Sequence, residues 1–229
     1  MIDGSLIMEM MMNQRIVLIH ATPLAVAPIN DTFARQWPEV EITNLLDDAL
    51  SRDRARVTAL TPTFYQRIDA LVDYALSIDA TAVLFTCSAM GKAIDASAKK
   101  HALPILKPNE AMFEQALALG DRIVMLATFA PAVSGMEAEF RQQAAAVGSQ
   151  AAITTIVVEG AREALSAGRA DEHNRLVIEA ARQLKDVDAI ILAHFSMEIA
   201  YQQVKAAVTY PVLSSPQAAV AKLKQLMDQ

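Results

Sequence analysis

The sequence predicts an α/β fold of two half-domains, each a small parallel sheet with flanking helices, related by a pseudo-twofold axis. The first observation is an internal repeat that keeps one constant offset along the chain: RIVLI at 15–19 matches RIVML at 122–126, and AVLFTCSAM at 82–90 matches AIILAHFSM at 189–197. The second is that short β-branched runs, typical of strands covered on both faces, alternate with segments of helical periodicity. Ligands of such sheets bind beyond the carboxyl ends of the strands, so we expect the active site in the cleft between the halves.

In the first half, apolar runs of four to six residues predict strands, and apolar residues spaced by three or four predict helices. Trp37-Pro38 ends the first helix, Thr61-Pro62 opens the second with proline in its first turn, and Gly120 closes the last. The polar run 47–56 is too charged to be core. Strands are therefore expected at 15–20, 41–46, 82–87 and 104–107, and helices at 24–36, 61–76, 89–100 and 109–119.

The second half repeats this series of elements. Alternating strands and helices demand right-handed parallel crossovers, so each half should form an open α/β sheet. The half-domains are expected to span residues 14–121 and 122–229, and strands and helices near the C-terminus are able to exchange between them. Strands are expected at 123–127, 153–158, 189–194 and 211–214, and helices at 133–147, 170–184, 201–208 and 217–227.

Composition excludes several classes of protein. The chain has 229 residues, 53% of them hydrophobic, which is enough for a sizeable core. A net charge of −6 argues against a nucleic-acid surface, and no uninterrupted apolar run is long enough to cross a membrane. One cysteine and four scattered histidines provide neither a disulfide framework nor metal-ligand spacing. We therefore expect a cytoplasmic protein without a metal site.

Residues 1–13 are rich in methionine and carry an acid ahead of their apolar part. They lack the basic region that begins a signal peptide. We expect this segment to be a flexible N-terminal arm.

Cys87, the only cysteine, is a candidate catalytic residue because it stands where a predicted strand meets a predicted helix. Backbone N–H groups at a helix N-terminus lower the pKa of a cysteine from its ordinary value of about 8.5. We therefore expect Cys87 to be alkylated with a midpoint below about pH 8. The alternative is an inert small hydrophobe, as free cysteines in apolar strands often are. The hydroxyls of Thr86 and Ser88, on either side, favour the reactive interpretation.

His194 matches Cys87 under the repeat and is the second candidate catalytic residue. Imidazole accepts and donates protons near neutral pH, so this histidine is able to act as an acid or a base. The alternative is an interior histidine held by hydrogen bonds. Of the others, His101 and His173 are expected on polar helix faces, and His20, at the end of the first strand, is a possible rim residue.

Hydroxyl side chains follow the predicted strands, where hydroxyls and backbone N–H groups converge on anions. Each of them alone is also compatible with a turn or a helix cap. As a set they are candidates for binding a substrate carboxylate, and Asn109-Glu110 is able to reach the same rim. The candidate binding residues are Thr22, Thr86, Ser88, Thr128, Ser196, Ser214 and Ser215.

With these residues in view, the chain resembles the aspartate/glutamate racemase superfamily, which includes glutamate, aspartate and hydantoin racemases, maleate isomerase and arylmalonate decarboxylase. The resemblance covers the chain from Arg15 onward and is carried by the duplicated α/β half, TCSAMG at 86–91, LAHFSM at 192–197 and ATFAP at 127–131. It implies two cysteines, one per half, acting as acid and base on opposite faces of a substrate α-carbon without pyridoxal phosphate or metal. Cys87 matches the first cysteine. His194 replaces the second, and Phe195 stands where a carboxylate-binding threonine is common.

This departure leaves three functions open. A Cys87/His194 pair is still able to racemise a substrate, with unequal kinetics in the two directions. A single donor, Cys87, is sufficient for decarboxylation of a malonate-type acid, in which the carbanion forms by loss of CO₂. A carboxylate-binding protein without turnover is the third possibility.

We expect a cofactor-independent racemase or epimerase of an amino acid, aspartate- or glutamate-like, or of a related carboxylate. Its partner would be the small carboxylate substrate, with no nucleic acid or membrane involved. The resemblance also implies a possible homodimer. Neither the substrate nor the oligomeric state follows from the sequence.

Overall fold

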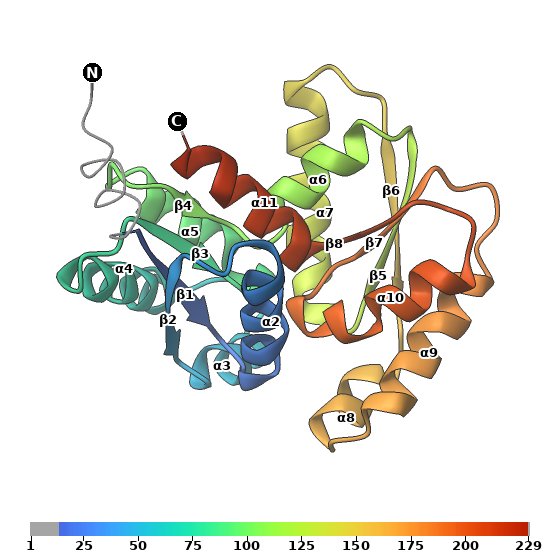
Figure 1. Ribbon diagram of the computed structural model, residues 1–229, viewed down its shortest axis with the longest axis horizontal. Helices are drawn as coiled ribbons and strands as arrows, with labels where there is room; N and C mark the ends of the chain where they lie inside the picture. The colour runs from blue at the N-terminus through green and yellow to red at the C-terminus, as the bar shows by residue number, and fades with distance from the viewer. Residues whose placement is uncertain (1–13, 229) are drawn as a thin grey trace.

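The computed structural model describes residues 14–228, so the expected arm at 1–13 lies outside the described residues. Two four-stranded parallel sheets have matching strand orders, β2-β1-β3-β4 and β6-β5-β7-β8 (Figure 1). These sheets, with helices packed on them, confirm the predicted α/β fold of two parallel-sheet halves. The strands are β1 (Arg15–His20), β2 (Glu41–Leu46), β3 (Ala82–Phe85), β4 (Ile105–Leu106), β5 (Arg122–Ala127), β6 (Ala152–Val157), β7 (Ala189–Leu192) and β8 (Val212–Ser214).

Strand register preserves the repeat. Ile16 of β1 pairs with Ala82 of β3, and the residues that match these two in the second half, Ile123 of β5 and Ala189 of β7, pair in the same way. The described α-helices are α2 (Val26–Gln36), α3 (Ala49–Ala55), α4 (Pro62–Ser77), α5 (Gly91–Ala98), α6 (Glu110–Leu117), α7 (Ala130–Ala146), α8 (Ala161–Ser166), α9 (Ala170–Arg182), α10 (Glu198–Ala207) and α11 (Ser215–Met227). Short 3₁₀ helices occur at η1 (Pro23–Ala25), η2 (Ser88–Met90) and η3 (Phe195–Met197).

Both faces of β1 are buried because its central residues are all apolar. Ile16 and Leu18 face α2 and α11, while Val17 and Ile19 face α3, α4 and α5. All four are at most 1% exposed, and burial of each such side chain contributes roughly 1.5–3 kcal/mol to folding. These contacts hold β1 at the centre of its sheet and fix where β3 ends.

Two helices pack on the sheet of the opposite half. Helix α6 precedes β5, and its Met112 and Phe113 lie in a core cluster with β5 and β7. The C-terminal helix α11 follows β8, but its Val220 and Leu223 lie in a core cluster with β1 and β3. Figure 1 shows α11 and α6 side by side between the sheets. This arrangement ties the halves together and brings the ends of β3 and β7 into one region.

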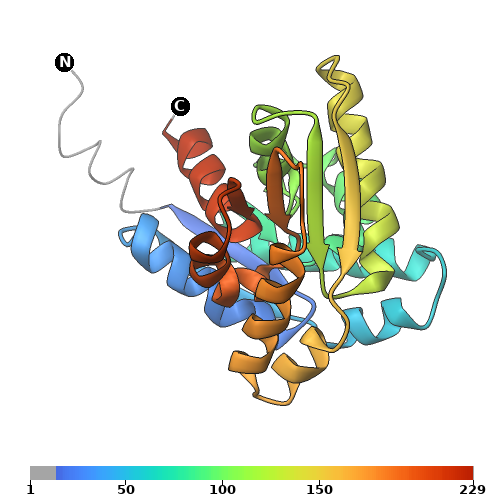
Figure 2. The same cartoon turned by 90° about the vertical axis from the view of Figure 1, so that its right-hand side faces the viewer.

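The second sheet is covered in the same manner. Figure 2 shows its strands running side by side with α7 along one face. Met136 and Phe140 of α7 are fully buried there, and the Phe140 ring meets Phe113 edge to face at 5.5 Å between centroids. Helices α9 and α10 pack on the other face.

Three local expectations were wrong. The run 47–56 contains α3, because Leu50 turns its side chain into the core and is only 1% exposed. The short helix α8 was not anticipated from the sequence. His173 lies in a buried position rather than on a polar face, because its Nδ1 bonds Asn174 and that amide in turn donates to the Ile199 carbonyl.

Candidate active site

Cys87 lies between β3 and η2 and is half-buried. Its backbone is extended, and the next residues turn at once into η2 and α5. Parallel strands on either side hold this junction, since the Thr86 N–H donates to the Ile19 carbonyl at 3.0 Å. The thiol therefore stands at the carboxyl end of the sheet, where ligands of α/β proteins bind.

The ionisation of Cys87 differs from the sequence expectation. Burial raises the pKa of the thiol above its ordinary value. The Ala89 N–H and the positive charges of Arg162 and Arg54 lower the pKa, but they do not offset the effect of burial. The expected alkylation midpoint below about 8 is therefore wrong in direction, because one N–H group at a short 3₁₀ turn does not replace the water that burial removes. At neutral pH the site holds a protonated thiol.

His194 lies at the equivalent junction after β7, and both of its ring nitrogens have hydrogen-bond partners. The backbone N–H of Phe129 donates to Nε2 at 3.2 Å, so Nε2 carries a lone pair and the proton is on Nδ1. Nδ1 faces the Ser88 hydroxyl at 3.4 Å. Burial, together with the charge of Arg162, lowers the pKa of His194 to about 3. His194 is therefore a neutral imidazole whose basic nitrogen is already occupied.

The contact between Ser88 and His194 joins the two halves at the site. It links the residue after Cys87 to the residue that matches Cys87 in the second half of the repeat. Of the candidate binding residues, Ser88 is the one with a direct contact to the opposite half's motif. The two motifs predicted to converge therefore meet through this pair.

Two arginines that sequence reasoning missed face the same region. Arg162 of α8 lies over the Phe129 ring at 4.4 Å and donates to the Ser51 hydroxyl of α3 at 3.3 Å. Arg54 of α3 donates to the Ala89 carbonyl at 3.3 Å, two residues after Cys87. Burial lowers the pKa of Arg162, although the guanidinium stays charged, because arginine side chains are not deprotonated in proteins. The site therefore combines one thiol with two cations.

A signal for these arginines exists in the repeat. Arg54 and Arg162 follow the second strand of each half, and the offset that relates Cys87 to His194 aligns them to within one position. This alignment was not used in the prediction because the 47–56 run is highly charged, and both a solvated surface and an anion-binding site are rich in arginine. Only their packing distinguishes the two.

Thr86 belongs to a buried polar chain beneath the site. Its hydroxyl and Nδ1 of His20 are 2.8 Å apart, and Nε2 of His20 reaches the Asn44 side chain at 2.8 Å. Burial lowers the pKa of His20, against the effect of the Asn44 bond. His20 is fully buried rather than at a rim, because Thr86 and Asn44 satisfy its ring. The pair fixes Thr86, and through it the backbone that leads to Cys87.

The structure places the other hydroxyls in different settings. Thr22 caps η1 by accepting the Leu24 N–H at 3.4 Å. Ser215 is fully buried and donates to Asn109 at 2.6 Å, which holds the turns after β4 and β8 together. Thr128, Ser196 and Ser214 are also buried. No contact on the described residues brings these five to Cys87, so a role in binding remains a prediction for them.

The described residues also bear on two expected absences. Between residues 14 and 228, no group of three or more His, Cys, Asp or Glu side chains could hold a metal ion. In the same range, no helix has both the length and the apolar character to cross a membrane.

A thiol, a neutral imidazole and two guanidinium groups therefore gather at the junction of the two parallel sheets. A family model of Asp/Glu/hydantoin racemases matches residues 16–223. The chain therefore belongs to the Asp/Glu/hydantoin racemase family, which confirms the resemblance found in the sequence. Family membership supports a racemase-type enzyme, and it leaves the substrate undetermined.

Solved structures with the same fold include glutamate racemase from Bacillus anthracis, with 11% identity over 95% of this chain and 82% of that chain and a TM-score of 0.72. Aspartate racemase from Picrophilus torridus has 15% identity over 94% of both chains and a TM-score of 0.71. A double mutant of arylmalonate decarboxylase in a liganded form has 19% identity over 93% of this chain and 92% of that chain, with a TM-score of 0.61. No curated protein sequence matched this chain significantly. At these identities the likeness concerns the fold.

Proposed function

We propose that the protein is a cofactor-independent enzyme that moves a proton at the carbon next to a carboxylate group, with Cys87 as the group that carries the proton. The supporting observation is that two guanidinium groups lie at the site: Arg54 donates to the Ala89 carbonyl, two residues after Cys87, and Arg162 lies over the ring of Phe129, whose N–H binds His194. One arginine comes from each half, so a small anion between the halves would be attracted to both. A carboxylate is the substrate group that matches a guanidinium in shape and charge.

The arginines would also stabilise the reaction itself. When a bond at the carbon next to a carboxylate breaks and leaves its electron pair behind, the negative charge spreads onto the carboxylate oxygens. Fixed positive charges near those oxygens stabilise the transition state more than the ground state. The S–H proton of Cys87 then passes to the carbon. The resulting thiolate is stabilised by Arg54, Arg162 and the Ala89 N–H until solvent returns a proton.

The geometry favours a reaction in which a proton is delivered to one face of the carbon. Racemisation needs a second acid or base on the opposite face. His194 has its basic nitrogen bonded to the Phe129 N–H and has a pKa of about 3, so it is a poor proton acceptor in this arrangement. Decarboxylation of a malonate-type acid needs only the Cys87 proton, because loss of CO₂ supplies the electron pair.

Racemisation or epimerisation of an amino acid or related carboxylate is the second candidate. The family match over residues 16–223 favours it. In that reaction, Nε2 of His194 would have to give up its hydrogen bond from the Phe129 N–H and accept a proton from the substrate. The two candidates therefore make different demands on the same nitrogen.

The deciding experiment incubates the purified protein in deuterated water with a panel of amino acids and of substituted malonates. One-sided chemistry predicts CO₂ release and a product with one deuterium and a single configuration, and His194→Gln should keep more than about a tenth of that rate. Racemisation predicts deuterium in both enantiomers. In His194→Gln inversion should then be lost, while Cys87 is still able to exchange the α-proton of one enantiomer. If Cys87→Ser is as active as the parent protein on every substrate that reacts, Cys87 is not the proton carrier. Cytoplasmic location and a homodimer remain predictions beside these.

A further inference from the structure

Helix α3 supplies two residues of the candidate site, although it is only seven residues long. An isolated helix of this length is not stable in water, so contacts outside the helix must hold it in place. Leu50 anchors one side of it in the core. Arg52, Asp53 and Arg54 give its remaining surface a strongly polar character.

Arg67 of α4 contacts both ends of α3. Its Nε and Nη2 donate to Oδ2 of Asp47 at 3.1 and 2.6 Å, and its Nη1 donates to Oδ2 of Asp53 at 2.7 Å. Asp47 precedes the helix, and its other oxygen accepts the Ala49 N–H at 3.2 Å. Asp53 lies towards the other end. Because the Arg67 side chain is only 26% exposed, these pairs are better shielded than ordinary surface ion pairs.

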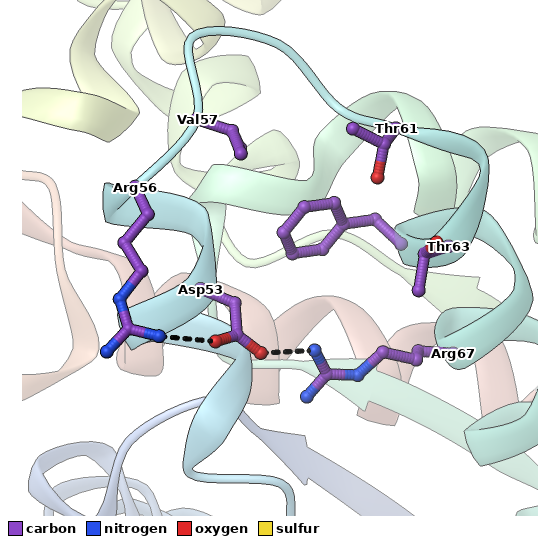
Figure 3. Close-up of a pocket in the computed structure, with 7 residues that line it drawn as sticks. Asp53, Arg56, Val57, Thr61, Thr63 and Arg67 are labelled. Atoms are coloured by element: carbon purple, nitrogen blue, oxygen red, sulfur yellow. Dashed lines mark hydrogen bonds and ion pairs between the residues drawn. The ribbon is translucent and has the colours of Figure 1, made fainter.

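Two hollows at the protein surface flank Arg67. A cavity of about 320 Å³, lined in part by Asp53, Val57 and Phe64, includes Arg67 in its wall. A second cavity of about 420 Å³, lined in part by Leu45 and Tyr74, also includes it. Figure 3 shows Asp53 between Arg56 and Arg67 at the first cavity. Arg67 therefore lies between two open hollows, and its ion pairs with Asp47 and Asp53 join α4 to α3 between them.

Helix α3 in turn delivers its side chains to the site. Arg54 donates to the carbonyls of Ala89 and Val57, at 3.3 and 2.7 Å, which directs its guanidinium to the loop that follows Cys87. Ser51 accepts a hydrogen bond from Arg162 of the opposite half. A shift of α3 would therefore move a positive charge away from the thiol.

We propose that Arg67 is a positioning residue that holds α3 at both ends and so keeps the charge of Arg54 beside Cys87. The proposal deepens the proposed function, because it concerns the same site. Its test follows the thiol itself and needs no substrate. A failure to find turnover would therefore leave the result interpretable.

The test measures the pH midpoint for alkylation of Cys87, the only thiol in the chain. Arg67→Gln should raise the midpoint by about 0.5–1 pH unit, because Arg54 would no longer lower the pKa of the thiol from a fixed position. Arg67→Lys should raise it less, since an ammonium keeps the charge but lacks the planar fork. The matched control is Arg175→Gln, which removes an ion pair of 2.8 Å on α9 and should leave the midpoint unchanged.

A double mutant distinguishes an effect of Arg67 through Arg54 from a general loosening of the structure around Cys87. If Arg67 acts through Arg54, Arg67→Gln adds no further shift in an Arg54→Gln background. An equal shift in both backgrounds overturns the proposal, as does a shift below about 0.2 unit in Arg67→Gln alone. Should Arg67→Gln fail to fold, Asp53→Asn removes one of the two pairs and leaves the Asp47 cap in place. That variant should show a smaller rise, and no rise would overturn the proposal.

Discussion

The two halves present the same backbone at the site but different chemistry. Cys87 after β3 and His194 after β7 occupy equivalent positions of the repeat, and each leads into a 3₁₀ turn and a helix. Cys87 is a protonated thiol beside two cations, whereas His194 is a neutral ring held by hydrogen bonds. The comparison teaches that the repeat keeps the position of the candidate residue, while the ionisation of that residue depends on what surrounds it.

The contacts between the halves differ in the same way. On one side, Glu139 of α7 approaches Gly91 at the start of α5, where an added Cβ would lie 3.6 Å from its carboxylate. At the equivalent contact, Glu198 stands at the position of Gly91, and Thr32 stands at that of Glu139. Each contact therefore contains a glutamate, Glu139 of α7 in the first and Glu198 of α10 in the second, and these two glutamates are not equivalent under the repeat.

The cation at each contact decides how strong it is. Lys107 lies 3.2 Å from Glu139 and 3.0 Å from Asp95, with its side chain 14% exposed. Glu198 is paired with Arg35 at 3.4 Å, but the Arg35 side chain is 59% exposed. The first contact is a buried ion pair, and the second is partly a surface one.

The largest expected effect concerns the site. Cys87→Ser should lower turnover about 10³-fold or more, because a serine hydroxyl is a far weaker acid than a thiol. His194→Gln should lower it less than about tenfold if proton transfer is one-sided, since a neutral hydrogen-bonding side chain remains. The measurement is initial rate on any substrate that the deuterium experiment identifies. Equal losses in the two variants would contradict the difference between the halves.

Introducing a thiol at the second position is a further test of the difference between the two halves. In His194→Cys, α-proton exchange of both enantiomers should appear or increase, because each face of the carbon would then have its own thiol. The measurement is deuterium incorporation by NMR for each enantiomer separately. A folded variant that binds substrate and exchanges neither would show that the second position cannot reach the carbon.

The next effect concerns the contacts between the halves. Lys107→Met should destabilise the protein by about 3 kcal/mol, because the buried Glu139 carboxylate would lose its cation. Arg35→Met should cost less than about 1 kcal/mol, since that pair is exposed. Urea unfolding of both variants at pH 7 provides the measurement. Similar losses would mean that burial does not distinguish the two contacts.

Glu110 should make the free energy of unfolding depend on pH. The equivalent residue in the second half, Gln217, has no titratable group. Burial raises the pKa of Glu110 from 4.5 to about 7, with Lys107 acting against the shift and Glu139 adding to it. Because the folded pKa is the higher one, this contribution is fully present below pH 4.5 and is lost as pH rises to about 7. Its size is about 1–3 kcal/mol.

The measurement is the free energy of unfolding between pH 4 and 8 for the parent protein and for Glu110→Gln. The difference between the two curves should change between about pH 4.5 and 7 and stay constant above. Glu179→Gln, at an exposed position on α9, is the control and should follow the parent curve. A constant difference across the whole range would assign Glu110 an ordinary pKa.

The smallest effect concerns the bond between α3 and Arg162. Ser51→Ala removes an acceptor at 3.3 Å and should cost about 0.5–1 kcal/mol. The equivalent position in the second half is Val158, whose side chain has no hydrogen-bonding group. Val158→Ala therefore serves as the comparison, and it should act through lost packing alone. The readout is urea unfolding together with the thiol midpoint, which should move in Ser51→Ala and not in Val158→Ala.

The sequence by itself determined the fold and the place of Cys87. The long internal repeat and the alternation of β-branched runs with helical periodicity are signals carried by short stretches of chain, and such signals suffice to predict strands, helices and their order. The end of a strand is likewise a local property. Cys87 could therefore be selected without coordinates.

The tertiary structure alone decided the chemistry at that place. The raised pKa of Cys87, the bond from the Phe129 N–H to His194 and the approach of Arg54 and Arg162 all join residues far apart in the chain. Burial and charge act through space over a few ångströms, and sequence spacing does not encode those distances. The polar run at 47–56, which indicated a solvated surface, forms a helix that places Arg54 against the Ala89 carbonyl, two residues after Cys87. Only the folded chain determines which of its side chains face inward.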